Sequence, residues 1–503
     1  MQNMKSLKTW SDKLYLILAS RWFWRITLGL FIVQALYIAL VGRFAMAFDE
    51  QFHFAAIQQY ALVLFPWSVT QPPGPAELSA FTTDGSYLYH YLMSWPYRLL
   101  ELVTTSQTVQ VIILRILDVA FVVGGFYVYR RLLRELGLSR AVTHAILAVV
   151  LFMPMTPWLA GQLTYDTLFF ALVGLSMLSL VRLVRAIYET NTLPLTLAAW
   201  SLSLLLLTSQ VKYAFLPAAF AAGVYVLGLL VWKTYVRHTI PWGRVWHTWK
   251  NSMRTGAGIM AVGVLLLSGV LFLQRYGMNM VRYGSPVPEC KVVLGHERCL
   301  GFGPYARDNR MHSEGWYEDL TTAQKFGYPV TWYKKMITES YFAVGPLEAK
   351  YPTANPLPVP YMVGVVLAVG GLLALVLRLP YLLRSGVEAQ LALVVIGGYV
   401  LALFAINLKA YLYTAVPVSI HGRYVLPFLP LLGYLLYVAL RPYMATARSR
   451  SVAIVLTSLI LLGSFYGGGI GAFVIGSDDQ WYWPQAVHTS QIVRSISETI
   501  VPH

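Results

Sequence analysis

Charged residues are scarce in this chain of 503 residues, because Lys, Arg, Asp and Glu together make up only 12% of it. A soluble globular domain carries about a quarter of such residues. Hydrophobic residues reach 57%. The composition excludes an ordinary soluble protein and predicts an all-α polytopic membrane protein.

Cysteine is also rare, with Cys290 and Cys299 the only two in the chain. Two cysteines are too few for a cysteine-ligated metal site, and no metal site is predicted. The pair encloses eight residues in a segment that we assign below to the oxidising outer side. We therefore favour a disulfide over two free thiols, with a stabilisation of roughly 2–3 kcal/mol in the chain-entropy account.

The formal net charge is +16, which raises the question of a nucleic-acid partner. The basic residues, however, stand in short runs between apolar segments and form no continuous patch. This distribution is typical of the cytoplasmic loops of membrane proteins, so no nucleic-acid partner is expected.

The basic loops predict the topology. Several Lys and Arg residues precede the first apolar run, which lacks a small-residue cleavage site, so we interpret it as a retained span with a cytoplasmic N-terminus. Alternation of the later basic loops then gives eleven spans. They are expected near 22–43, 109–129, 141–159, 164–183, 193–209, 214–232, 255–273, 361–378, 388–406, 424–440 and 451–473.

The same alternation divides the chain into four parts. The parts are an N-terminal transmembrane module, 1–273, with its first outer loop at 44–108; an extracytoplasmic cap, 274–360; the C-terminal transmembrane helices, 361–473; and an extracytoplasmic tail, 474–503. Two helices at the outer interface are expected within the first outer loop, at 49–65 and 86–103, and one further helix is expected within the cap, around Thr321–Tyr341.

Ten polar residues share the outer rim of this topology. Carboxylates that meet several cations suit a reaction that removes a proton from a hydroxyl and stabilises a departing phosphate. The candidates are Asp49, Glu50, His53, Tyr89, His90, Tyr165, Asp166, Lys212, His421 and Arg423.

The stretch Asp49-Glu50-Gln51-Phe52-His53 carries the strongest signal, since charged groups at the mouth of a span are costly without a use. In a helix both acids lie one turn from the imidazole of His53. We assign Asp49 and Glu50 as catalytic residues, one as base and the other as an orienting group. The alternative is that the two acids only cap an interfacial helix.

Lys212 and Arg423 lie on the outer side, against the positive-inside bias, so each needs an anionic partner. Arg suits bidentate phosphate contact and Lys acts as a point charge. A structural ion pair is the alternative for both residues. Tyr165 and Asp166 open a span, where an acid also serves as a cap.

Several short motifs occur in an order that resembles a known family. They are Phe48-Asp49-Glu50-x-x-His53-Phe54, Tyr87-Leu88-Tyr89-His90-Tyr91, Leu114-Arg115, Thr164-Tyr165-Asp166 and Gly422-Arg423-Tyr424-Val425-Leu426-Pro427. In this order they resemble a bacterial family of multi-spanning proteins that is similar to the GT-C glycosyltransferases, which include protein mannosyltransferases and the lipid A aminoarabinose transferase. The likeness covers roughly 20–185 and 360–440.

The resemblance implies an inverting glycosyltransferase of the bacterial inner membrane. It would move a sugar from a polyprenyl-phosphate donor to a cell-envelope glycan or lipid acceptor at the outer face, with Asp49 as catalytic base. No cofactor is predicted; some GT-C enzymes use a divalent metal, but Asp49, Glu50 and Asp166 supply too few ligands to predict one. The alternatives are a transporter or flippase of a lipid-linked anion, and a glycan polymerase or ligase. The absence of internal repeats disfavours the transporter.

Overall fold

The fold is entirely helical in the part of the chain that the computed structural model describes, residues 2–47, 49–341, 357–466 and 468–500. About 80% of the chain is helix, and within those ranges the only strand-like pairing is one isolated bridge between Gly42 and Tyr482. The all-α prediction is therefore confirmed.

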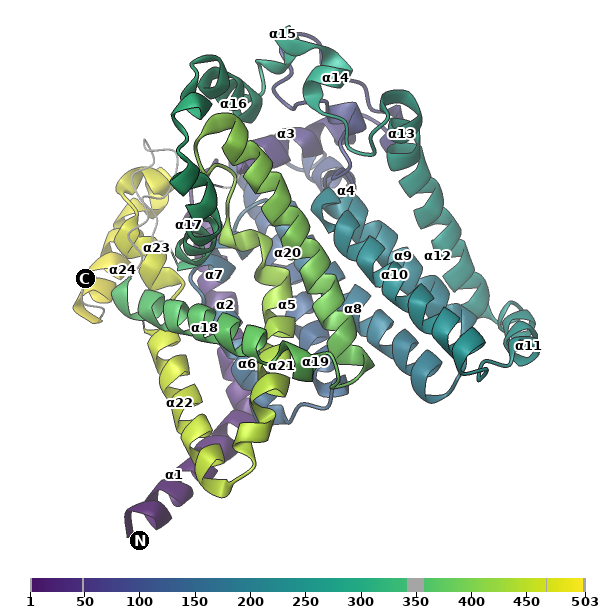
Figure 1. Ribbon diagram of the computed structural model, residues 1–503. Helices are drawn as coiled ribbons and strands as arrows, with labels where there is room; N and C mark the ends of the chain where they lie inside the picture. The colour runs from purple at the N-terminus through teal and green to yellow at the C-terminus, as the bar shows by residue number, and fades with distance from the viewer. Residues whose placement is uncertain (1, 48, 342–356, 467, 501–503) are drawn as a thin grey trace.

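Nine helical segments of the described ranges are long and apolar enough to cross a membrane, which is typical of a polytopic membrane protein (Figure 1). They are α2 (Arg21–Val41), α5 (Gln107–Glu135), α8 (Tyr165–Glu189), Tyr213–Val236 with α10 (Leu216–Val231), Gly256–Tyr283 with α12 (Gly256–Phe272) and α13 (Met278–Tyr283), α18 (Pro358–Leu377), α20 (Val387–Thr414), Leu426–Met444 with α21 (Leu429–Leu440), and Ala447–Gly476 with α22 (Ala447–Phe465) and α23 (Ile470–Gly476).

The predicted count of eleven spans is not reproduced, because two of the expected segments form shorter helices. α6 (Arg140–Phe152) and α9 (Leu195–Val211) have 13 and 17 residues. At 1.5 Å per residue they extend about 20 and 25 Å, short of a hydrocarbon core of about 30 Å. The prediction of one continuous span at 141–159 is wrong. Met153 has an extended backbone conformation, with ψ 126°, because Pro154 follows it, and a second helix, α7 (Met155–Ala160), begins after the break.

The remaining helices lie at the two ends of the bundle or on its surface. They are α1 (Gln2–Ala19), α3 (Glu50–Ala61), α4 (Leu88–Glu101), α11 (Trp242–Ser252), α14 (Cys290–Leu294), α15 (His296–Cys299), α16 (Gly303–Ser313), α17 (Thr322–Tyr341), α19 (Leu379–Leu382) and α24 (Val487–Ile500).

The centre of the bundle is the pair α5 and α8, which pack along their length. Gly125 of α5 allows this approach, because a Cβ there would lie 2.5 Å from the ring of Phe170 on α8. Phe126 and Tyr129 place their rings 4.9 Å from the same ring. Small residues that let helices approach are typical of membrane bundles.

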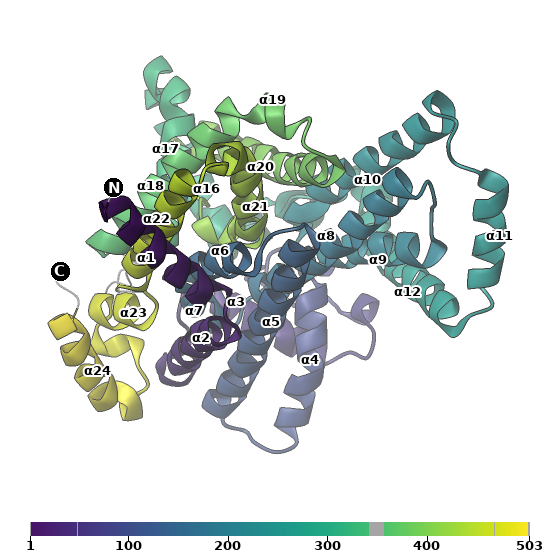
Figure 2. The same cartoon turned by 90° about the horizontal axis from the view of Figure 1, so that it is seen from below.

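The two ends of the bundle carry different elements. α3, α4 and the short helices α13 to α16 lie at one end, and the start of α1, α11 and the turn between α21 and α22 lie at the other (Figure 1). Viewed along the bundle, the α4–α5 turn and the hairpin α10–α11–α12 stand at the periphery (Figure 2). We call the end with α3 and α4 the α3 end.

The C-terminal tail fixes the chain just before α3. The Arg43 amide donates to the Trp481 carbonyl at 2.8 Å, and the Trp483 amide donates to the Val41 carbonyl at 3.0 Å. The tail therefore positions the loop that leads into the candidate site.

Candidate functional site

Four charged side chains from distant parts of the sequence meet at the α3 end, and we call them the charge cluster: Asp49, Asp166, Lys212 and Arg423. Arg423 Nη2 lies 3.3 Å from Asp49 Oδ2, and its Nη1 lies 3.7 Å from Asp166 Oδ2. Lys212 Nζ pairs with Asp166 Oδ1. The cluster thus joins four residues that the sequence placed only on the same side of a membrane.

Exposure divides the cluster into two parts. The side chains of Asp166, Lys212 and Arg423 are at most 5% exposed, whereas that of Asp49 is 64% exposed. Burial lowers the pKa of Lys212 to about 8, although Asp166 opposes this shift. Asp49 is therefore the acid of the cluster that an entering molecule can reach.

Local backbone structure positions each member of the cluster. Asp49 takes a left-handed conformation, φ 65°, at the cap of α3, which Asp tolerates better than most residues. Asp166 stands in the first turn of α8, whose cap residue Thr164 accepts a hydrogen bond from the Asp166 amide at 3.3 Å. Lys212 directly follows α9.

Arg423 lies in a 3₁₀ turn, Gly422–Tyr424, that contacts α17 closely. A Cβ on Gly422 would lie 2.7 Å from the Met336 carbonyl oxygen. Glycine is therefore required where this turn packs, and the packing sets the place of Arg423.

Aromatic rings surround the ammonium group of Lys212. Its Nζ lies 4.3 Å from the ring centroid of Tyr424 and 4.9 Å from that of Tyr165. A cation near ring faces is stabilised without being neutralised. Tyr165, a predicted site residue, therefore lines the cluster, and Tyr424 joins it as a residue that the list of candidates missed.

Glu50 is the main correction to the predicted site. Its carboxylate accepts from Arg115 Nε at 2.8 Å and Nη2 at 2.7 Å, and from the amides of Met46 and Leu163 at 2.8 and 3.0 Å. Both side chains are 0% exposed. Because all its acceptor positions are occupied by protein donors, we assign Glu50 a structural role and withdraw it as a catalytic residue. Phe48, the first residue of the motif, lies outside the described residues.

His53 and His90 form a buried pair, with His53 Nδ1 2.8 Å from His90 Nε2. Burial lowers the pKa of His90 to about 3 and holds the pKa of His53 well below its ordinary value, with His90, Arg423 and Lys212 adding to the shift of His53. Both rings are neutral. One ring nitrogen of the pair therefore donates its proton to the other. The His53 ring lies against that of Tyr165, with 4.7 Å between their centroids.

Asp118 of α5 contacts residues of α4 and α8 and was also missed. It accepts from the Tyr89 hydroxyl at 2.7 Å, from Thr167 Oγ1 at 2.5 Å and from the Thr164 amide at 3.4 Å. Tyr89 therefore serves to hold α4 against α5 and α8. The sequence carries one signal for Arg115 and Asp118, because both are charged residues inside an expected membrane span.

His421, also a predicted site residue, contacts α17. Its Nδ1 lies 3.4 Å from Glu339 Oε2 on α17. Burial, with Arg423, Lys335 and Lys212, holds the pKa of His421 well below its ordinary value, so this contact is not an ion pair. His421 borders the cluster as a neighbour of Arg423 in sequence.

Cys290 and Cys299 form a disulfide, with a sulfur–sulfur distance of 2.04 Å. Within the described ranges, no group of three or more His, Cys, Asp or Glu side chains is arranged to hold a metal ion.

Comparisons with protein-family models, with curated proteins and with solved structures gave no match.

Proposed function

We propose that the chain is an integral membrane glycosyltransferase that moves a sugar from a polyprenyl-phosphate donor to a glycan or lipid acceptor at the outer face of a bacterial inner membrane. One observation carries the proposal. The exposed Asp49 carboxylate lies 3.3 Å from the buried Arg423, which shares Asp166 with the buried Lys212. A reachable base thus stands beside two cations at one end of a bundle of apolar helices. This site suits a lipid-linked anion. The assignment of a sugar as the transferred group rests on the resemblance of the motifs to the GT-C glycosyltransferases.

Burial makes the two cations effective partners for a phosphate. A charge pair 4 Å apart is worth about 1 kcal/mol in water and about 4 kcal/mol at an effective dielectric of about 20. Arg423 and Lys212 are each nearly inaccessible to water, so they stand closer to the second case. Charge that develops on the donor phosphate is stabilised there more than at an open surface.

The reaction would proceed as one displacement. The acceptor hydroxyl attacks the anomeric carbon of the donor, on the side opposite the lipid phosphate. Asp49 takes the hydroxyl proton, a new carbon–oxygen bond forms, and the bond from the anomeric carbon to the phosphate oxygen breaks with its electron pair left on the phosphate. The configuration at the anomeric carbon inverts.

Donor binding would also release the base. A phosphate that contacts Arg423 Nη2 competes with Asp49 for the same group, and the long contact of 3.3 Å is readily replaced. Asp49 is then left to accept a proton from the acceptor. The cluster would therefore couple donor arrival to activation of the acceptor.

The proposal is tested with purified protein in nanodiscs, a panel of polyprenyl-phosphate sugars and candidate glycan acceptors. Asp49→Asn should lower kcat by at least about a hundredfold, because a general base contributes about 10²–10⁴. Glu77→Gln is the matched control, since Glu77 is an exposed acid of the same outer loop. Turnover that survives Asp49→Asn unchanged removes the base assignment. Movement of intact donor across the bilayer without bond cleavage would instead identify a flippase.

A further inference from the structure

A polar pocket opens between α3, α4 and α5, away from the charge cluster. Its volume is about 390 Å³, and its walls include Gln58, Tyr97, Glu101, Thr104, Gln107 and Gln110. Tyr97 and His90 are seven residues apart on α4, so the pocket lies about 10 Å along that helix from the histidine pair. The rings of Tyr97 and Phe54 pack edge to face at 5.6 Å and join α3 to α4 between the pocket and the histidine pair.

The chemistry of the pocket walls differs from that of the charge cluster. No described residue that lines the pocket is a cation, and Glu101 is the one lining residue with a formal charge. Three amides, two threonines and a phenol supply the rest. Such groups both donate and accept, as vicinal hydroxyl groups require, whereas a phosphate would find no cation here.

Hydrogen bonds within the pocket fix some of these groups and leave others for a ligand. Gln58 Nε2 donates to the Tyr97 hydroxyl at 3.1 Å, and Gln110 Nε2 donates to the Thr104 carbonyl at 3.0 Å. The amide oxygens of both glutamines have no hydrogen-bond partner among the described residues. The pocket therefore presents oriented acceptors on a pre-arranged wall.

The surroundings of the pocket are strongly apolar. Leu102 and Val103, which follow Glu101 directly, are each 84% exposed, and Leu99 and Trp95 are also exposed. Figure 2 shows the α4–α5 turn at the periphery of the bundle. A ligand that fills the pocket can therefore lay an alkyl chain against this rim.

We infer that the α4–α5 pocket binds the uncharged, polyhydroxylated headgroup of a sugar-bearing amphiphile. Its assignment as the acceptor site rests on the proposed transferase function, but the binding itself does not. The two sites would then bind different molecules. The cations of the charge cluster hold the anionic donor, and the amides and the single carboxylate of the pocket hold a hydroxyl-rich molecule about two helical turns away.

The test uses the full chain in phosphatidylcholine nanodiscs, purified without any glycosidic detergent. The probe is an octyl β-glucoside with a diazirine in its alkyl chain, and mass spectrometry maps the labelled peptides. Labelling is expected within residues 55–60 and 97–110. Unlabelled octyl β-glucoside should compete, while octyl phosphate and octylamine should compete at least tenfold less well.

The decisive variant is Gln58→Leu with Gln110→Leu, which should reduce labelling about tenfold, because the lost hydrogen bonds to the headgroup are worth about that factor. Gln59→Leu is the control, since Gln59 is the half-buried neighbour on α3 that does not line the pocket. Unchanged helicity and elution volume establish that the variants fold.

Labelling outside these peptides, equal labelling in the double variant and the control, or better competition by octyl phosphate or octylamine would each overturn the inference. If labelling fails while turnover persists, the proposed function stands without this site. If labelling holds and no acceptor turns over, the pocket remains a glycolipid site and its acceptor role is removed.

Discussion

The neighbours Asp49 and Glu50 have opposite environments, and this difference predicts opposite effects of substitution. Glu50 and Arg115 form a bidentate pair with 0% side-chain exposure. Removal of one partner from such a pair leaves an uncompensated buried charge and costs about 3–5 kcal/mol. Arg115→Met should therefore lower the thermal unfolding temperature strongly, as measured by circular dichroism in detergent.

The control for this prediction is Arg131→Gln, which breaks an exposed pair with Glu135 that is worth less than about 1 kcal/mol. Replacement of both Glu50 and Arg115 by leucine should be milder than either single change, because no charge is left behind. A stable Glu50→Gln variant that has lost turnover would return Glu50 to the catalytic site.

Lys212 gives the site a pH dependence with a definite sign. Burial lowers its pKa from 10.5 to about 8 against the opposing effect of Asp166, while Arg423 lowers it further. Above about pH 8 the cluster loses one positive charge, so binding of octyl phosphate should weaken as the pH rises. Lys212→Arg should flatten this profile, because arginine keeps its charge. Titration calorimetry between about pH 7 and about pH 9.5 measures both proteins.

The effect of the same group on stability runs in the other direction. The unfolded chain holds the Lys212 proton more tightly, so this group makes the free energy of unfolding rise between about pH 8 and about pH 10.5. Deprotonation of Lys212 therefore does not destabilise the fold in this pH range, so weaker phosphate binding there would not result from unfolding caused by this group. Equal pH profiles for Lys212→Arg and the unsubstituted protein would remove Lys212 from the binding site.

At the scale of elements, the disulfide joins α14 to α15, and this pair packs against the loop between α3 and α4. Ala76 and Ala80 pack against Cys290 and Cys299, and the Ala76 amide donates to the Arg298 carbonyl at 2.8 Å. The double change Cys290→Ser with Cys299→Ser should destabilise this contact by about 2–3 kcal/mol. Hydrogen exchange of residues 72–82 should then be faster, with α8 unchanged as the internal control. Unaltered exchange at 72–82 would show that the loop is held without the disulfide.

Local signals predicted the elements better than they predicted the pairing of side chains. The helix expected at Thr321–Tyr341 is Thr322–Tyr341, and those expected at 49–65 and 86–103 are Glu50–Ala61 and Leu88–Glu101. The break at Pro154 was readable, because a residue before proline leaves the helix. Helix bounds depend on residues close in sequence.

Side-chain pairing depends on residues far apart in sequence. The partner of Glu50 is Arg115, 65 residues away, and no local pattern separates the buried Glu50 from the exposed Asp49 beside it. Alternation of basic loops could bring Asp49, Lys212 and Arg423 to one side, but not into one cluster. Distances within the site follow only from the packed helices.

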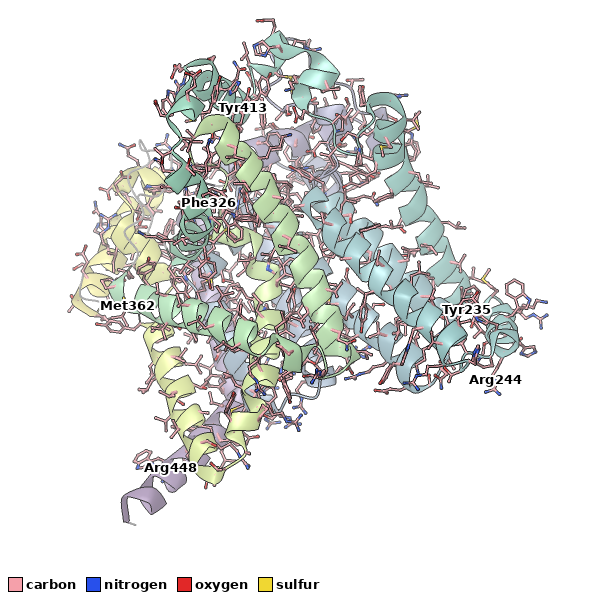
Figure 3. The ribbon with its side chains drawn as sticks, in the orientation of Figure 1. Tyr235, Arg244, Phe326, Met362, Tyr413 and Arg448 are labelled. Atoms are coloured by element: carbon pink, nitrogen blue, oxygen red, sulfur yellow. A yellow bond between two sulfur atoms is a disulfide. The ribbon has the colours of Figure 1, made fainter. Side chains whose placement is uncertain are left out.

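At the scale of the whole molecule, two independent features predict the same orientation. The sequence from 190 to 288 contains no Asp or Glu, and its basic residues gather around α11, which the positive-inside rule assigns to the cytoplasm. The disulfide lies at the α3 end and requires an oxidising side. Figure 3 shows Arg244 and Arg448 toward one end and Tyr413 toward the other.

Thiol labelling tests this orientation with little background, because both native cysteines are bonded to each other. An impermeant maleimide should label Ser313→Cys on α16 in intact spheroplasts, and should label Asn251→Cys on α11 only after permeabilisation; both positions are exposed. The reverse pattern would put the charge cluster in the cytoplasm, where nucleotide sugars are available. The case for a lipid-linked donor at an outer site would then fail, even with the geometry of Asp49 and Arg423 unchanged.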